Sequence, residues 1–200
     1  MPIPMTDPEG RAAAEPVSAT AYRTLMAAFP AGVAVVTAAD EDGQQYGMTC
    51  TAVSSVSVSP PTLLVCIQHS SRTLAVLSRS GSFAVNLLDD RARAVAELFA
   101  SRGQDRFRHV AWTARPGCGG PHLAHAAHSV ADCRVTGSVP FADHVVVFGE
   151  VFRVTTGNDA WPRPLVYGMH EYWSLAHSGA APQPVSLPGR PSNPDTERNR

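Results

Sequence analysis

The stretch GMTCTAVSSVS, residues 47–57, is the part of this sequence that decides the fold. It follows a strand-like run and holds one Gly, one Met, two Thr, three Ser and four small Cys, Ala or Val residues. Low bulk lets a backbone approach a flat ligand closely, while hydroxyls and free N–H groups can bind the polar edge of such a ligand. A ligand-binding segment and an ordinary Ser/Thr-rich loop are both compatible with this composition, because hydroxyl residues also favour loops for local reasons.

The composition is that of a soluble globular protein. The chain has 200 residues, of which 44% are hydrophobic and 16% charged, enough for one domain with a substantial core. A net charge of −1 gives no electrostatic reason to expect nucleic acid or an anionic membrane as a partner. No apolar run approaches the roughly 18 residues that span a bilayer, and the N-terminus lacks a signal-peptide pattern. Four widely spaced cysteines indicate reduced thiols, and we expect a cytoplasmic protein.

Both ends of the chain have the composition of tails. Residues 1–17 carry four prolines and no periodic apolar pattern, and residues 178–200 are proline-rich and polar. Such segments cannot bury enough apolar surface to fold, so we expect both to be disordered. One folded domain is therefore expected over residues 18–177.

Strand patterns dominate the segment between the tails. Helices are expected at 18–29, where Ser18 can cap, at 71–81, where Gly81 can end the helix, and at 89–102. The expected strands are 32–38, 44–51, 62–67, 83–88, 128–139 and 144–156, and residues 164–175 are expected to close the sheet. Strands joined by short turns are typical of an antiparallel barrel, and no GxGxxG opens a helix after a strand, which argues against a Rossmann site.

A second group of polar residues, HSSRT at 69–73, lies at the start of the helix expected at 71–81. Ser71, Arg72 and Thr73 would offer hydroxyls, a guanidinium and a positive helix end, which together suit an anion. The alternative is an ordinary helix cap without a ligand.

Seven motifs occur in the order of a known family. They are FPAGVAVVTA, YGMTCTAVSSVSVSPPTLLVCI, HSSRT, FAVNLL, DRFRHVAW, ADHVVVFGEV and PLVYGMHEYW. Across about residues 20–175 the chain resembles the flavin reductase family with an FMN-binding split barrel. The resemblance implies a mainly β fold with a few helices, an antiparallel Greek-key split β-barrel of the FMN-binding type. It also implies a homodimeric enzyme that transfers a hydride from NADH or NADPH to FMN or FAD and supplies the reduced flavin to a partner monooxygenase.

The resemblance also implies which residues bind. Residues 47–57, which we call the flavin segment, would contribute Met48, Thr49, Cys50, Thr51, Ala52, Ser54 and Ser55. Ser71, Arg72 and Thr73 would complete the phosphate site, Asn86 would place an amide beside the ring, and Phe107 would cover an apolar part of the flavin or the adenine of FAD. His144 would lie near the nicotinamide, with Tyr172 as a second candidate. Judged without the family, Asn86 and Phe107 are equally explained as a strand-end amide and a core aromatic.

Two positions depart from the family pattern. Val53 replaces the usual Phe of the flavin segment. Gly168 stands where the family usually has His, and His170 follows two residues later. The departure at Gly168 bears on nicotinamide binding more than on flavin binding.

The implied chemistry needs no nucleophile and no acid or base from the protein. Hydride transfer requires only that the two rings be held at roughly 3–3.5 Å in the right orientation. No G-x-S-x-G nucleophile elbow is present, and we expect no triad. The alternative function is a flavin-binding split-barrel protein that retains its flavin as a carrier or for other redox chemistry.

Two further patterns are given ordinary explanations. His122, His125 and His128 lie three apart, with Cys118 and Cys133 nearby, but their spacing fits no standard zinc site. We expect no metal, and we expect His122 and His125 on a solvated turn. Cys50 is expected to be a small, buried, inert thiol rather than a redox group.

Overall fold

The computed structural model of the chain describes residues 15–103, 105–157 and 162–175. The tails expected at 1–17 and 178–200 lie outside these residues, apart from 15–17. In chain order the elements are α1 (Ala19–Ala27), β1 (Ala31–Gly32), β2 (Ala34–Ala39), β3 (Gln45–Cys50), β4 (Val53–Val58), β5 (Pro61–Gln68), α2 (Arg72–Ser80), β6 (Ser82–Leu88), η1 (Asp90–Ala92), α3 (Arg93–Ala100), η2 (Arg106–Arg108), β7 (Ala127–Phe141), β8 (His144–Thr156), β9 (Leu165–Gly168) and β10 (Glu171–Ser174).

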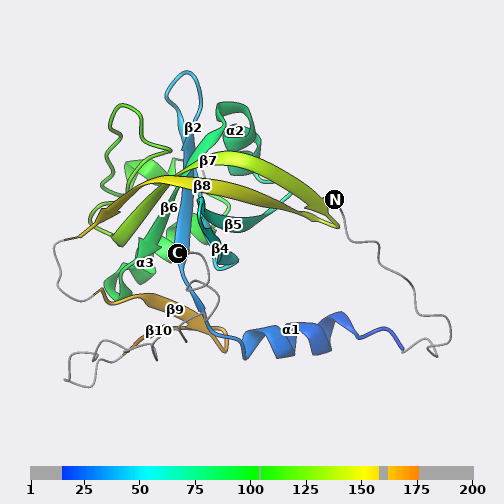
Figure 1. Cartoon of the computed structure of the whole chain (residues 1–200). Coiled ribbons are helices and arrows are strands. Elements are labelled where there is room, and N and C mark those ends of the chain that lie inside the picture. Colours follow the sequence, from blue (N-terminus) through cyan, green and yellow to red (C-terminus); the bar gives the residue numbers. More distant parts are fainter. Residues whose placement is uncertain (1–14, 104, 158–161, 176–200) are drawn as a thin grey trace, which may run out of the picture.

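The body of the molecule is a curved antiparallel sheet of seven strands in the order β3-β2-β6-β7-β8-β5-β4 (Figure 1). A separate sheet, in the order β1-β9-β10, lies beside it, and α1 projects beyond one end of this small sheet (Figure 1). The expected mainly β split barrel is confirmed.

The split in the barrel falls within the flavin segment. β3 and β4 follow one another in the chain, but they form the two opposite edges of the seven-stranded sheet and do not pair with each other. Thr51 and Ala52 cross from one edge to the other, and the Ala52 carbonyl accepts a hydrogen bond from Cys66 N of β5 at 3.0 Å. Residues 47–57 therefore border an opening where two sheet edges meet.

Two apolar cores explain the sequence of β2. Val36 faces the barrel interior with Val65 and Phe83, whereas Val35 faces α3, where it joins the cluster of Phe99. Because β2 is covered on both faces, it reads as a continuous apolar run rather than an alternating one.

The helices match the sequence expectations in part. The Ser18 hydroxyl accepts a hydrogen bond from Ala21 N at 3.2 Å, and α2 ends at Gly81 with φ +70°. The single helix expected at 89–102 is instead a 3-10 turn followed by α3. None of the residues of α1 is buried.

The expectation that residues 164–175 close the main sheet is wrong. They form the β9–β10 hairpin, and β9 pairs with β1. The segment after residue 52, which we did not assign as a strand, is β4, an edge strand paired with β5 and irregular between Ser55 and Ser57. Its hydroxyl-rich sequence is tolerated because most of its side chains are exposed.

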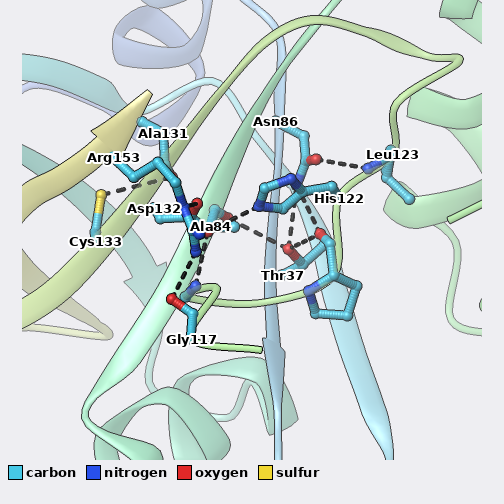
Figure 2. A network of polar contacts seen from close by, with 12 residues as sticks. Thr37, Ala84, Asn86, Gly117, His122, Leu123, Ala131, Asp132, Cys133 and Arg153 are labelled. Carbon is cyan, nitrogen blue, oxygen red and sulfur yellow. Dashed lines mark hydrogen bonds and ion pairs between the residues drawn. The ribbon is translucent and has the colours of Figure 1, made fainter. Parts of the chain in front are cut away.

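A buried polar network fastens the loop at 117–123 to the outer face of the sheet (Figure 2). The Asp132 carboxylate is fully buried and accepts from Gly119 N at 2.7 Å and from Arg153 Nε at 2.7 Å. His122 Nε2 lies 2.8 Å from the same carboxylate. His122 is 7% exposed, so its expected place on a solvated turn is wrong. A buried carboxylate needs such partners, and His122 supplies one of them.

Candidate functional site

The flavin segment presents small, accessible groups at the barrel split. Thr51, Ala52, Ser54 and Ser55 are all exposed. Because the edges of β3 and β4 facing the split are not paired with each other, their backbone N–H and C=O groups can bind a ligand there. This arrangement suits the polar edge of a flat ring.

Residues 69–73, which we call the anion group, lie against the flavin segment. Ser71 is the N-cap of α2, yet its hydroxyl makes no capping bond and instead lies 3.4 Å from Met48 Sδ. Arg72 is exposed, and its guanidinium has no hydrogen bond or ion pair with any residue that the structure describes. Thr73 follows in the first helical turn and is buried. An unpaired guanidinium at the start of a helix is suited to a phosphate.

His144 lies beside this anion group. It is the first residue of β8 and pairs in register with Gln68 at the end of β5. Its Nδ1 lies 2.8 Å from Asp143 Oδ1, and this contact lowers the pKa of the Asp143 carboxyl. The Asp143 carbonyl accepts from His69 N at 2.9 Å, which ties the start of β8 to the 69–73 loop.

Tyr172 lies in a different part of the molecule. Its ring packs against Tyr167, with centroids 5.0 Å apart, and the Arg93 guanidinium lies 5.5 Å from its ring centre. Burial raises the pKa of the Tyr172 hydroxyl. The structure therefore joins His144 to the anion group and Tyr172 to α3, on two sides of the flavin segment.

Cys50 contributes no accessible thiol. Its side chain is 5% exposed, and the Sγ lies 3.7 Å from the carbonyl oxygens of Ala52 and Cys66. Burial raises the pKa of this thiol to about 11, so it stays protonated and unreactive near neutral pH. Only the backbone of Cys50 remains for a ligand.

Asn86 is corrected from a ring contact to a structural residue. Its side chain is fully buried, and Nδ2 donates to the Val35 carbonyl at 3.1 Å. Oδ1 accepts from Leu123 N at 2.8 Å (Figure 2). Both the nitrogen and the oxygen of this amide form hydrogen bonds within the chain, so neither is left to bind a flavin.

Phe107, which we expected to cover an apolar part of the flavin, packs behind the flavin segment. It packs edge-on against Phe99 and Trp112, with centroids 5.1 and 5.9 Å away. A Cβ added at Gly47 would lie 2.8 Å from Phe99 and 3.2 Å from Phe107, so only glycine fits there. Arg106, which sequence reasoning missed, donates from Nη1 to the Gly47 carbonyl at 2.7 Å. The sequence feature that could have identified Arg106 is its position next to Phe107 in the DRFRHVAW motif.

Gly168 also has a steric explanation. A Cβ at this position would lie 3.2 Å from the Cα and Cβ of Pro30. A histidine there would require Pro30 to shift by a few tenths of an ångström, which favours glycine at this position.

The remaining histidines are dispersed. His125 is exposed, and His128 Nδ1 lies 3.1 Å from the Ser129 hydroxyl. Within the described ranges no group of three or more metal-ligating side chains is found. In the same ranges no helix is both long and apolar enough to cross a membrane.

Comparison with known proteins places this site in a family. Residues 26–176 match the flavin reductase like domain. This chain belongs to that family. A relative named flavin reductase (NADPH), from Lentzea aerocolonigenes, is 48% identical over 78% of this chain and 89% of its own length. The reductase subunit HsaB of a flavin-dependent monooxygenase from Rhodococcus jostii is 31% identical over 88% of each chain.

A solved structure has the same architecture. The NADH:FAD oxidoreductase of Streptomyces globisporus, solved with NAD and FAD fragments, is 26% identical to this chain. It superposes with a TM-score of 0.74, covering 89% of this chain and all of the other. The family resemblance of the seven motifs is thus confirmed.

Proposed function

We propose that this protein is an NAD(P)H-dependent flavin reductase that transfers a hydride from NADH or NADPH to FMN or FAD. The observation that carries this proposal is the position of residues 47–57, which border the split of a flavin reductase barrel with small, exposed side chains. The relatives named as NADPH- and NADH-dependent reductases support it.

The residues present fit a flavin mononucleotide. Ser71, Arg72 and the N-terminus of α2 would hold the phosphate, since the Arg72 charge has no partner among the described residues. Ser54 and Ser55 would bind the ribityl chain. Thr51 and Ala52 would leave room for the ring, and Phe107 would brace the segment behind it.

The flavin supplies the hydride-accepting chemistry when bound, so the work of the protein is positioning. The backbone of residues 49–52 would fix the polar edge of the ring, and His144 and Tyr172 would orient the nicotinamide nucleotide. No residue would donate or accept a proton during the hydride transfer. The rate would therefore depend on how closely the two rings are aligned.

The exposed apolar side chains around α1 support a homodimer. Tyr22 is 57% exposed, and Leu25 and Phe29 are each 67% exposed. Trp173 on β10, in the small sheet beyond whose end α1 projects, adds a further exposed aromatic and is 56% exposed. A monomeric protein rarely leaves a group of large apolar side chains exposed to solvent. A second copy of the chain would cover it, which sedimentation equilibrium would test.

A monooxygenase is the proposed recipient of the reduced flavin, because the relative HsaB is a reductase subunit of such an enzyme. A cytoplasmic location, where NAD(P)H is available, suits both this role and the four free thiols. The alternative, in which the protein retains its flavin, is not favoured by relatives that are named for flavin reduction.

The experiment is steady-state oxidation of NADH and NADPH by the purified full chain with added FMN, FAD or riboflavin. We expect turnover that saturates with added flavin. Absence of nucleotide oxidation with all three flavins would overturn the proposal.

A further inference from the structure

A row of three polar side chains crosses the sheet on the face that points away from the barrel interior. Thr37 of β2, Asn86 of β6 and Asp132 of β7 are each fully buried, and their strands are neighbours in the sheet. Val36 and Cys133, which stand next to two of them in the chain, belong to the cluster inside the barrel. Because successive side chains of a strand point to opposite faces, the three polar groups share the outer face (Figure 2).

The first two of these side chains bind the backbone of the loop at residues 117–123. The Thr37 hydroxyl donates to the Pro121 carbonyl at 2.6 Å, and Asn86 Oδ1 accepts from Leu123 N at 2.8 Å. Asn86 Nδ2 also donates to Thr37 Oγ1 at 3.1 Å, so the two side chains hold the loop together. Buried polar groups that are all paired hold a chain in one arrangement.

The third side chain, Asp132, holds the loop through His122. Gly119 N and Arg153 are its other partners, and His122 Nε2 lies 2.8 Å from its carboxylate. The backbone of His122 in turn exchanges two hydrogen bonds with Thr113, at 2.8 and 2.9 Å. His122 therefore joins the buried carboxylate to the part of the chain that precedes the loop.

Thr113 leads directly to the residues behind the flavin segment. Trp112, its neighbour in the chain, packs edge-on against Phe107 with centroids 5.9 Å apart. Phe107 comes so close to Gly47 that a Cβ added there would lie 3.2 Å from its ring, and Arg106 donates to the Gly47 carbonyl at 2.7 Å. One continuous set of contacts thus runs from the buried carboxylate to the flavin segment.

We propose that His122 is a positioning residue for flavin binding. By joining Thr113 to Asp132 it fixes residues 105–123, which we call the brace loop, and the brace loop holds Gly47 in place. Ligand-binding groups need such support, because small displacements of a binding backbone weaken its contacts. His122 is 7% exposed and itself touches no ligand in this account. The inference rests on the proposed function and adds a residue that sets the affinity for the flavin ring.

The test compares His122→Leu and His122→Gln with the wild type, in fluorescence titrations with FMN and with riboflavin below the unfolding temperature. Leucine removes the nitrogen that faces Asp132, whereas glutamine keeps a side-chain N–H donor. Asp132 retains Gly119 N and Arg153 as partners in both variants, so both should fold. The control is Val151→Ala, which shortens a side chain packed against the barrel-interior cluster and leaves the brace loop intact.

We expect His122→Leu to raise the dissociation constants of FMN and riboflavin by the same factor, roughly three- to tenfold, the effect of losing one hydrogen bond. The factor is the same because the brace loop supports the backbone assigned to the ring and not the phosphate site. His122→Gln should recover most of the loss, and Val151→Ala should lower Tm with both constants unchanged. A His122→Leu variant that melts earlier but binds both flavins as tightly as the wild type, or that loses affinity for FMN alone, would overturn the inference.

A double variant tests the route through the brace loop. Arg106→Met combined with His122→Leu should weaken FMN binding by less than the product of the two single effects, because both substitutions break the same set of contacts. Losses that multiply would mean that the two residues act independently, against the inference. A wild type that neither binds nor reduces flavin would contradict the proposed function, whereas wild-type binding and turnover with unaffected His122 variants would refute this inference alone.

Discussion

Arg106 donates a hydrogen bond to the carbonyl oxygen of Gly47 at 2.7 Å and so connects η2 to the first residue of the flavin segment. A second bond joins Arg106 to the Ser101 carbonyl at the end of α3. Partial burial lowers the pKa of this guanidinium. Together with Phe99 and Phe107 behind Gly47, this contact fixes where the flavin segment begins.

Arg106→Met should therefore weaken FMN binding, although Arg106 is not expected to touch the ligand. We expect a loss of about tenfold, or about 1.4 kcal/mol, because the segment is no longer held in place. Fluorescence titration with FMN measures this loss. Arg108→Met, which removes a more exposed arginine of the same turn, is the matched control. Equal FMN affinity in a folded Arg106→Met variant would show that the contact serves stability alone.

Arg72→Ala should weaken FMN much more than riboflavin, because only FMN carries the phosphate that a guanidinium can pair with. We expect at least a tenfold difference between the two ligands, about 1.4 kcal/mol. Arg79→Ala, near the other end of α2, controls for loss of charge on this helix. Titrations in which both ligands lose equal affinity would show that Arg72 does not bind the phosphate.

Ala52→Leu should obstruct the ring. The Ala52 side chain is exposed at the split, so a leucine there would project into the space we assign to the flavin. Overpacking of this kind costs about 1–3 kcal/mol of binding free energy. Ala94→Leu, at an exposed position of α3, is the control. Unchanged FMN affinity in the Ala52 variant would remove this segment from the site.

His144→Ala should raise KM for NADH and leave FMN affinity nearly unchanged. The side chain is about half exposed at the start of β8, where it can reach a nucleotide beside the anion group. If the role is uniform binding, kcat falls little, whereas lost alignment lowers kcat as well. Asp143→Ala, which removes the partner of the imidazole, should give a smaller effect of the same kind. Unaltered kinetics with lower thermal stability would make His144 structural.

Local signals in the sequence were sufficient to predict most of the strands and the helix α2. The alternation of β8 and the Gly81 helix end depend only on neighbouring residues, so both could be predicted. The edge strand β4 could not, because its serine-rich sequence has no apolar alternation and its pairing with β5 is set by the fold. Hydroxyl residues are as compatible with an exposed edge strand as with a loop.

The errors in the candidate site arose from long-range contacts. His122 is buried because Asp132, ten residues later, needs a partner inside the protein. Asn86 was assigned to the flavin, but its amide is used by Val35 and Leu123, which are distant in sequence. The exposed face of α1 was likewise unpredictable, because its apolar spacing is the same whether the covering surface belongs to the same chain or to a second copy.

The measurement that tests the central claim most directly is anaerobic reduction of FMN by NADH, with FMN in large excess over the full-length protein. Loss of flavin absorbance counts the flavin molecules reduced by each protein molecule. A flavin reductase that releases its product should reduce the whole FMN pool, many equivalents per chain. Reduction that stops at one flavin per chain, or that does not exceed the rate without protein, would contradict the account.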